Sequence, residues 1–185
     1  MSVDPSILSI LHFPDAVLRR RGSDVAEVTD EVRRVAERMI ELMFQAEGIG
    51  LAAPQVGLSW RMFVAHVPAV EGRSTEVEPP TATASPRVYI NPVLSEARGE
   101  VVSYEEGCLS LPDIRGDVLR PEVITITATG LDGERFTSTG AGLLARCWQH
   151  EFDHLDGVLI IDRMTQMSRL KNRSAIRELE RDAGL

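Results

Sequence analysis

The stretch QHEFDH, residues 149–154, places two histidines four positions apart, with a glutamate directly after the first. Four residues of a helix turn through about 400°, so His150 and His154 would project from one face, one turn apart. Glu151 would then lie about 100° around the helix, close enough to reach water beside a bound ion. We therefore predict a helix that carries two metal ligands and a general base. The alternative is an ordinary helix whose histidines are held by hydrogen bonds.

A catalytic metal site of this kind needs a third protein ligand and leaves the fourth position to water. Cys108, in the segment EEGCLSLP, follows a glycine that permits close backbone approach, and a thiolate is a strong ligand. Cys147 competes with it, because Cys147 shares a helical face with both histidines. Three ligands on one straight helix span about two turns, however, and cannot easily reach a single ion. We favour Cys108 and assign Cys147 to a pocket wall, although an isolated cysteine is often an inert buried thiol.

The segment GIGLAAPQVG, residues 48–57, has small residues that let a backbone approach a ligand closely. Gln55 within it offers an amide donor for a developing oxyanion. The signal is weak by itself, because a glycine-rich helix end followed by a turn is commoner. The spacing fits neither a phosphate-binding loop nor a dinucleotide-binding fingerprint.

The remaining patterns predict an α+β fold. Residues 30–46 repeat apolar side chains at helical spacing, with Thr29 as a candidate cap, and a further helix is expected near residues 165–182. An Asp-Gly turn at 132–133 should join two antiparallel strands. Further β-like runs are RMFVAHV, RVYINPVL, GEVVSYE and EVITITAT. We expect antiparallel or mixed sheets packed around a central HExxH helix, with N-terminal and C-terminal helices.

Length and charge limit the classes of protein that this chain can belong to. At 185 residues we expect one catalytic domain, residues 1–185, with an exposed loop at about 71–86, which is rich in Pro, Ser, Thr and Glu. A net charge of -8 disfavours a broad DNA-binding or anionic-membrane surface. The sequence contains neither a signal peptide nor an apolar run of membrane-spanning length, and it has only two cysteines. We therefore expect a cytoplasmic protein.

Taken together, three motifs resemble those of the peptide deformylase family. They are GIGLAAPQ at 48–55, EGCLS at 106–110 and QHEFDH at 149–154, in the order that the family shows. The resemblance extends to FPDAVLR near the N-terminus, to RPEVITI, and to the sequence around QHEFDH, so it covers most of the chain. It implies a hydrolase that removes the N-formyl group from the N-terminal formylmethionine of nascent polypeptides and releases formate.

The resemblance also implies a role for each site residue. Cys108, His150 and His154 would hold one divalent metal ion, Fe(II) in vivo, with Zn, Ni or Co able to replace it. Metal-bound water would be the nucleophile, and Glu151 would act as general base and then as acid. The oxyanion would be stabilised by the Gln55 amide and the backbone N–H of Leu109. Gly50 would hold the substrate backbone, and Ile49 and Cys147 would line the methionine pocket together with His150.

Three other interpretations concern partners and related classes. Residues 163–185 carry six positive and three negative charges, so this C-terminal segment could contact the ribosome, although an ordinary solvated helix is the simpler expectation. A metalloprotease could also use HExxH, but its third ligand would commonly be a downstream His or Glu, which has no recognisable motif here. A structural metal module would need a fourth protein ligand and would have no need of Gln55.

Overall fold

The computed structural model describes residues 3–183, so residues 184 and 185 of the basic C-terminal segment lie outside it. The strands are β1 Gly50–Ala52, β2 Met62–Ala65, β3 Arg87–Cys108, β4 Leu111–Thr129 and β5 Arg135–Ala141. The α-helices are α1 Asp30–Gln45, α2 Gly142–Leu155, α3 Ile160–Arg163, α4 Gln166–Lys171 and α5 Arg173–Asp182. Three short 3-10 helices are η1 Pro5–Ile7, η2 Ala16–Arg19 and η3 Ala53–Val56. None of the helices in this range is long and apolar enough to cross a membrane.

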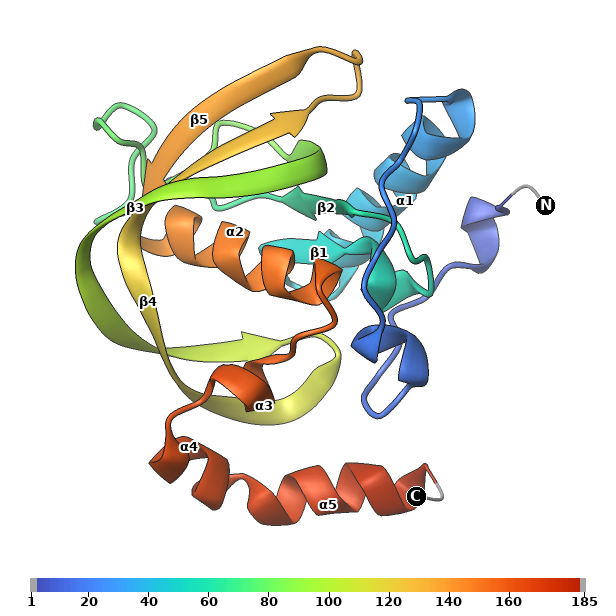
Figure 1. The fold of residues 1–185 in the computed structure, drawn as a ribbon, viewed down its shortest axis with the longest axis vertical. Helices are drawn as coiled ribbons and strands as arrows, with labels where there is room; N and C mark the ends of the chain where they lie inside the picture. The colour runs from blue at the N-terminus through green and yellow to red at the C-terminus, as the bar shows by residue number, and fades with distance from the viewer. Residues whose placement is uncertain (1–2, 184–185) are drawn as a thin grey trace.

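The five strands form one antiparallel sheet in the order β1-β2-β3-β4-β5. Strands β3 and β4 form a long hairpin whose register shifts near Ile90, Ser95 and Arg98. Such bulges bend a strand and increase its twist, and here the hairpin curves around α2 (Figure 1). The prediction of an α+β fold with antiparallel strands around the HExxH helix is confirmed.

Helix α2 lies in the middle of the molecule, enclosed by the curved hairpin and close to β1 (Figure 1). Its buried side chains lie on almost every side, because strands pack around it. Leu144, Ala145 and Trp148 join β2, β3 and β4 in one apolar cluster. The histidines therefore sit on a helix that packing fixes in position.

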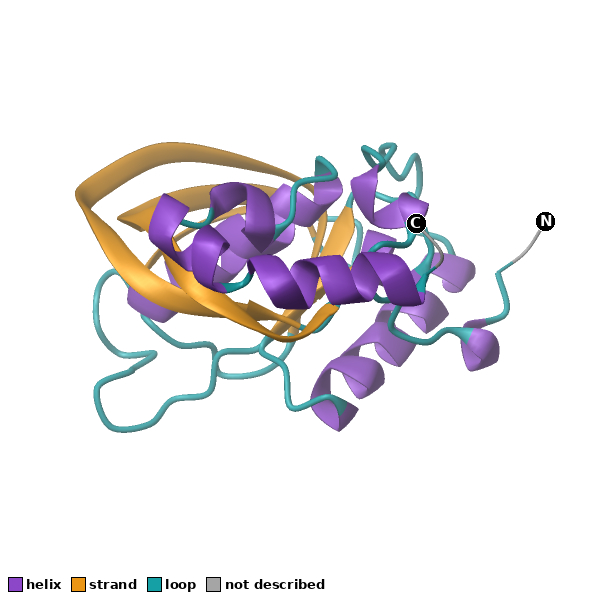
Figure 2. Ribbon diagram, turned by 90° about the horizontal axis from the view of Figure 1, so that it is seen from below, coloured by secondary structure: helices purple, strands orange, loops and turns teal. Residues whose placement is uncertain are grey.

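In the N-terminal part of the chain, α1 packs against strands β1 and β2. Thr29 caps α1 by accepting from the Val32 N–H, as predicted, and Met39 and Met43 are fully buried against β1 and β2. Figure 2 shows the loop that joins β2 to β3 as a long irregular segment outside the sheet. Residues 71–86 contain no helix or named strand, and most of them are exposed or half-buried, whereas Ala82 is buried.

Two features differ from the sequence expectation. RVYINPVL and GEVVSYE belong to a single strand, β3, because the bulges carry the backbone through the intervening polar residues. The C-terminal helix expected at 165–182 is divided into α4 and α5, with Asn172 between them. The Asn172 side chain donates to the backbone oxygens of Arg115 and Ser168, which fixes this junction against β4.

Candidate metal centre and active site

Three donor side chains from two elements meet at one point. Cys108 is the last residue of β3, whereas His150 and His154 lie one turn apart on α2. The two Nε2 atoms are 3.2 Å apart, and the Cys108 Sγ lies 3.3 Å from Nε2 of His154. All three donor atoms lie within 4.8 Å of one another. The structure thus brings together the three residues that the sequence suggested as ligands.

The spacing and chemistry of these atoms fit a divalent metal ion. Two imidazole nitrogens on a tetrahedral ion are about 3.4 Å apart when each metal–nitrogen bond is near 2.1 Å, close to the observed separation. Burial, with the charges of His150 and Arg120, keeps the pKa of His154 well below its usual value, so this ring is neutral, as a ligand must be. Nδ1 of His154 has no hydrogen-bond partner among the described residues.

His150 is oriented by a buried carboxylate. Its Nδ1 lies 3.1 Å from Oε2 of Glu106, which leaves Nε2 directed toward the other donors. Burial acts to lower the pKa of His150, but hydrogen bonds with Cys108 and Glu106 outweigh it and raise this pKa. The same negative surroundings that favour a proton on His150 also favour a cation at the site.

Glu106 is itself held by two arginines. Arg120 donates to both of its oxygens, at 2.7 and 2.9 Å, and Arg146 donates to Oε1 at 2.7 Å. Arg120 also reaches Asp153 on α2, whose carboxylate pairs with Arg163. Burial acts to raise the pKa of Glu106, yet hydrogen bonds from His150 and Arg120 hold it well below its usual range. The network joins the hairpin to α2 and fixes the ring of His150.

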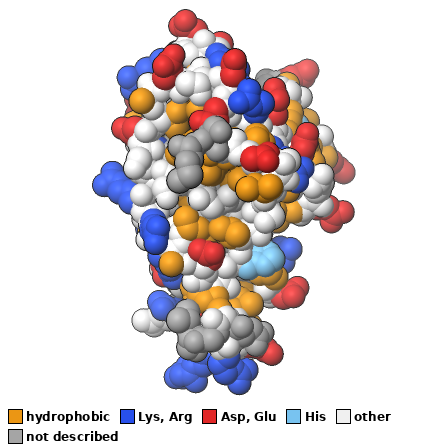
Figure 3. Space-filling model, turned by 90° about the vertical axis from the view of Figure 1, so that its right-hand side faces the viewer, with side chains coloured by type: hydrophobic (Ala, Val, Ile, Leu, Met, Phe, Trp, Pro, Cys, Tyr) orange, Lys and Arg blue, Asp and Glu red, His pale blue; other side chains and the backbone are white. Residues whose placement is uncertain are grey.

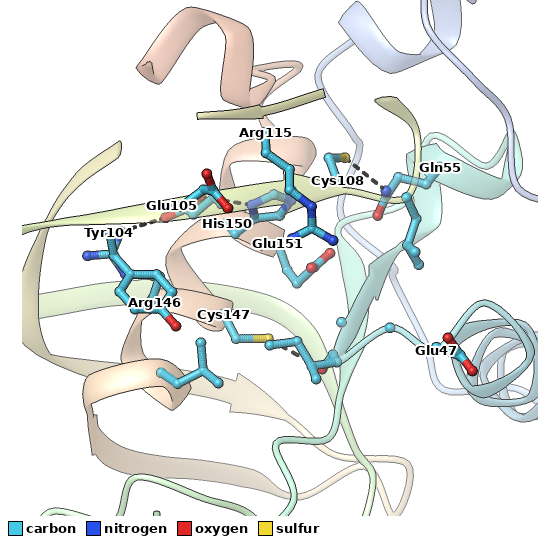
Figure 4. Close-up of a pocket in the computed structure, with 17 residues that line it drawn as sticks. Glu47, Gln55, Tyr104, Glu105, Cys108, Arg115, Arg146, Cys147, His150 and Glu151 are labelled. Carbon is cyan, nitrogen blue, oxygen red and sulfur yellow. Dashed lines mark hydrogen bonds and ion pairs between the residues drawn. The ribbon is translucent and has the colours of Figure 1, made fainter. Parts of the chain in front are cut away.

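Glu151 lies beside the ligands without joining the ion-pair network. Its side chain points into the cavity (Figure 4), and Oε2 is buried with no hydrogen-bond partner within residues 3–183. Burial raises the pKa of Glu151 to about 7, although the charges of His150 and Arg120 act in the opposite direction. A carboxyl group with such a pKa can both accept and release a proton near neutral pH.

Gln55, in η3, faces the same cavity from the opposite side. Its Nε2 lies 3.6 Å from the Cys108 Sγ (Figure 4) and 3.1 Å from the Ser110 hydroxyl. Leu109 follows Cys108 in the turn between β3 and β4, so its backbone lies at the same edge of the site. The amide of Gln55 is therefore next to the donor cluster.

The cavity has a volume of about 250 Å³ and is bordered by the backbone of β1. Gly50 lies so close to Glu151 that an added Cβ would be 2.3 Å from Oε1, so only glycine leaves room for this carboxylate. Ile49 and Cys147 line the cavity, and the Cys147 Sγ donates to the Ile49 carbonyl oxygen at 3.4 Å. Cys147 is thus part of the wall and lies outside the cluster of three donors.

The sequence reasoning missed four polar residues that shape this site. They are Glu106, Ser110, Arg120 and Arg146. Glu106 had a usable signal, because residues two apart in a strand share a face and Cys108 follows it by two. No sequence signal pointed to Arg120 or Arg146, because Glu106, with which both pair, lies at least 14 positions away in the sequence.

The α+β fold and a cysteine-and-two-histidine cluster beside a free glutamate define a class of HExxH metalloenzymes. Residues 7–170 match the family model described as polypeptide deformylase. A peptide deformylase of Rhodopseudomonas palustris is 41% identical over 178 residues, which cover 96% of this chain and 95% of that protein. Peptide deformylase 2 of Gloeobacter violaceus is 43% identical over 157 residues, 85% of this chain and 79% of that protein.

A solved structure supports the same relationship. The crystal structure of peptide deformylase from Ehrlichia chaffeensis aligns with a TM-score of 0.84 and 32% identity, covering 96% of this chain and 97% of that one. The chain therefore belongs to the peptide deformylase family, a family of metalloenzymes whose known reaction is the deformylation of N-formylmethionine.

Proposed function

We propose that this protein removes the N-formyl group from the formylmethionine of nascent polypeptides in the cytoplasm and releases formate. The observation that carries the proposal is the cluster of Cys108, His150 and His154 beside Glu151, whose buried Oε2 has no hydrogen-bond partner in the described part of the chain. These three residues would hold a divalent metal ion, Fe(II) in vivo, with Zn, Ni or Co as substitutes. The metal would supply Lewis acidity and lower the pKa of water at the site.

Glu151 carries the proton through the reaction. It takes a proton from the water that attacks the formyl carbon, and it then gives this proton to the methionine nitrogen as the C–N bond breaks. The products are formate and a free amine, so one water is consumed and no other reactant is needed. The carboxylate is buried, and its Oε2 has no partner among residues 3–183, which suits a group that gains and loses one proton in each cycle.

Gln55 and Leu109 stabilise the charge that develops on the formyl oxygen. The side-chain amide of Gln55 and the backbone N–H of Leu109 donate hydrogen bonds to it, and loss of one such donor costs about 2.7 to 4 kcal/mol of barrier. The main chain of Gly50 binds the substrate backbone. Ile49, Cys147 and the ring of His150 line the cavity and contribute to the apolar pocket for the methionine side chain.

Formate release from a formyl-Met tripeptide, with the metal content of the same anaerobic sample, tests the proposal. Metal-dependent release that collapses in Glu151→Gln, while this variant keeps its metal, would support both the reaction and the base. Bound metal without formate release would refute the reaction and leave the ligand assignment standing.

We also propose that the basic C-terminal segment contacts the ribosome. Arg169, Arg173 and Arg177 line one groove, and none of them forms an ion pair with a carboxylate in the described part of the chain. Figure 3 shows basic side chains gathered at the end of the molecule where α5 lies. Changing these three arginines to glutamine should abolish co-sedimentation with ribosomes, as should deletion of residues 168–185. Unchanged co-sedimentation of both folded variants would exclude the contact.

A further inference from the structure

The amide of Gln55 is held in one of its two orientations by the backbone. The Ala52 N–H lies 2.8 Å from Oε1 of Gln55. A backbone N–H can only donate, so the atom that faces it must be the amide oxygen. The amide nitrogen is therefore directed to the opposite side, toward the turn between β3 and β4.

On that side the two hydrogens of Nε2 meet two different acceptors. The Ser110 hydroxyl oxygen is 3.1 Å away, and the Cys108 Sγ is 3.6 Å away. Sulfur is a weak acceptor, whereas the hydroxyl is a good one. The bond to Ser110 therefore fixes the amide plane, and the second N–H, near Cys108, is the one left to donate to a substrate oxygen.

Ser110 is fully buried and Gln55 nearly so, with side chains enclosed by protein. Ser110 does not line the cavity, whereas Gln55 does. The hydroxyl of Ser110 thus has a partner in the catalytic machinery without reaching substrate itself.

A segment near the N-terminus holds the two backbones at a fixed separation. The Leu11 N–H donates to the carbonyl oxygen of Gln55, and the Phe13 N–H donates to that of Ser110, each at 2.8 Å. Leu11 and Phe13 are two residues apart in the segment between η1 and η2, so their N–H groups tie η3 to the β3–β4 turn. The distance between the Gln55 amide and the Ser110 hydroxyl is therefore set by the fold.

We propose that Ser110 is a positioning residue, whose hydroxyl holds the Gln55 amide so that one N–H is kept for the formyl oxygen. The inference rests on the proposed function, because it takes Gln55 as the oxyanion donor. The Ser110 hydroxyl acts only through Gln55, so its removal should lower kcat and leave KM unchanged.

A double-mutant cycle tests this dependence. Ser110→Ala should lower kcat about tenfold, the equivalent of one hydrogen bond, whereas Gln55→Ala should lower it by about 10² to 10³. In the Gln55→Ala background, Ser110→Ala should change kcat by less than about twofold. An equal tenfold loss in both backgrounds would overturn the proposal, as would an unchanged kcat in Ser110→Ala alone.

Ser168→Ala is the matched control. Ser168 is also buried and hydrogen-bonded, but its partner is Asp117. The same loss of a buried hydroxyl there should lower thermal stability without lowering kcat. A comparable fall in kcat in both serine variants would mean that Ser110 has only a structural role.

The side-chain amide signals of Gln55 give a readout that is independent of turnover. In the zinc-loaded, ¹⁵N-labelled protein, which is diamagnetic, they can be assigned by their loss in Gln55→Ala. Ser110→Ala should shift them and speed their exchange with water, and unchanged signals would overturn the proposal. If the wild-type protein released no formate, the proposed reaction would fail, yet these signals would still decide whether Ser110 orients Gln55.

Discussion

Replacing Gly50 by alanine should disable the enzyme while leaving it folded. The added Cβ would lie 2.3 Å from Oε1, 2.7 Å from Cδ and 2.8 Å from Cγ of Glu151, whereas ordinary contact begins at 3.4 Å. The carboxylate must therefore move by about 1 Å, a displacement that can cost about 10²-fold in rate when it misplaces a catalytic group. Glu151 ends in a flexible carboxylate that can move, so we expect a stability loss near the lower end of the 1 to 3 kcal/mol typical of overpacking.

The assay is kcat/KM for formate release, with thermal unfolding measured on the same preparation. Gly130→Ala is the control, because the three atoms nearest to the added methyl all belong to the exposed side chain of Asp132 in the β4–β5 turn. Glu151→Asp shortens the side chain, so Gly50→Ala should cost a smaller factor in that background than in the wild type. If Gly50→Ala retained more than half of the wild-type activity, the steric reasoning would be wrong.

Other substitutions distinguish the proposed metal ligands from the residues that orient them and from those that only line the cavity. Glu106→Gln should destabilise the protein by about 3 kcal/mol in denaturant unfolding, because it leaves buried Arg120 with one carboxylate, Asp153, in place of two; a loss below 1 kcal/mol would contradict this. The pKa of Glu106 is lowered in the folded protein, so this carboxylate stabilises the fold above its unfolded pKa of 4.5, and the stabilisation is lost as the pH falls below that value. The free energy of unfolding of Glu106→Gln should therefore fall less steeply with decreasing pH than that of the wild type. Both proteins would be treated with a chelator before the measurement. Cys108→Ala should lose its metal, whereas Cys147→Ala should retain it, and the reverse result would exchange the two assignments. Thiolate-ligated iron is oxygen-sensitive, so the iron form should lose activity in air faster than the nickel form; equal lifetimes would count against it.

Local patterns predicted those features of the structure that depend on neighbours in the sequence. His150 and His154 lie on one helical face because four residues make about one turn, and this spacing was visible in QHEFDH. Thr29 caps α1 for an equally local reason, since its side chain reaches an N–H three residues ahead. Cys108 is favoured over Cys147 as the third ligand because three side chains on one straight helix span about two turns and cannot easily reach a single ion.

Long-range partners were beyond the same reasoning. β3 runs unbroken through Pro92 and Gly99, which ordinarily mark strand ends, because bulges absorb them along the curved hairpin. Glu106 and Arg120 meet because β3 and β4 pair, and Asp153 joins them only once the hairpin has wrapped around α2. The local sequence around each of these residues gives no indication that their charges meet in one buried site.

The buried charges around the site divide into two sets with different consequences. Glu106 and Asp153 are balanced by Arg120, helped by arginines from α2 and α3, so these carboxylates are fully occupied in holding helix and hairpin together. Glu151 has no such partner among the described residues, and the donor atoms of the cluster face one another. Because the arginines occupy the first set, Glu106 can orient His150 without itself serving as a metal ligand or as the proton carrier. Substitutions in that set should therefore appear first in stability, and substitutions of Glu151 first in turnover.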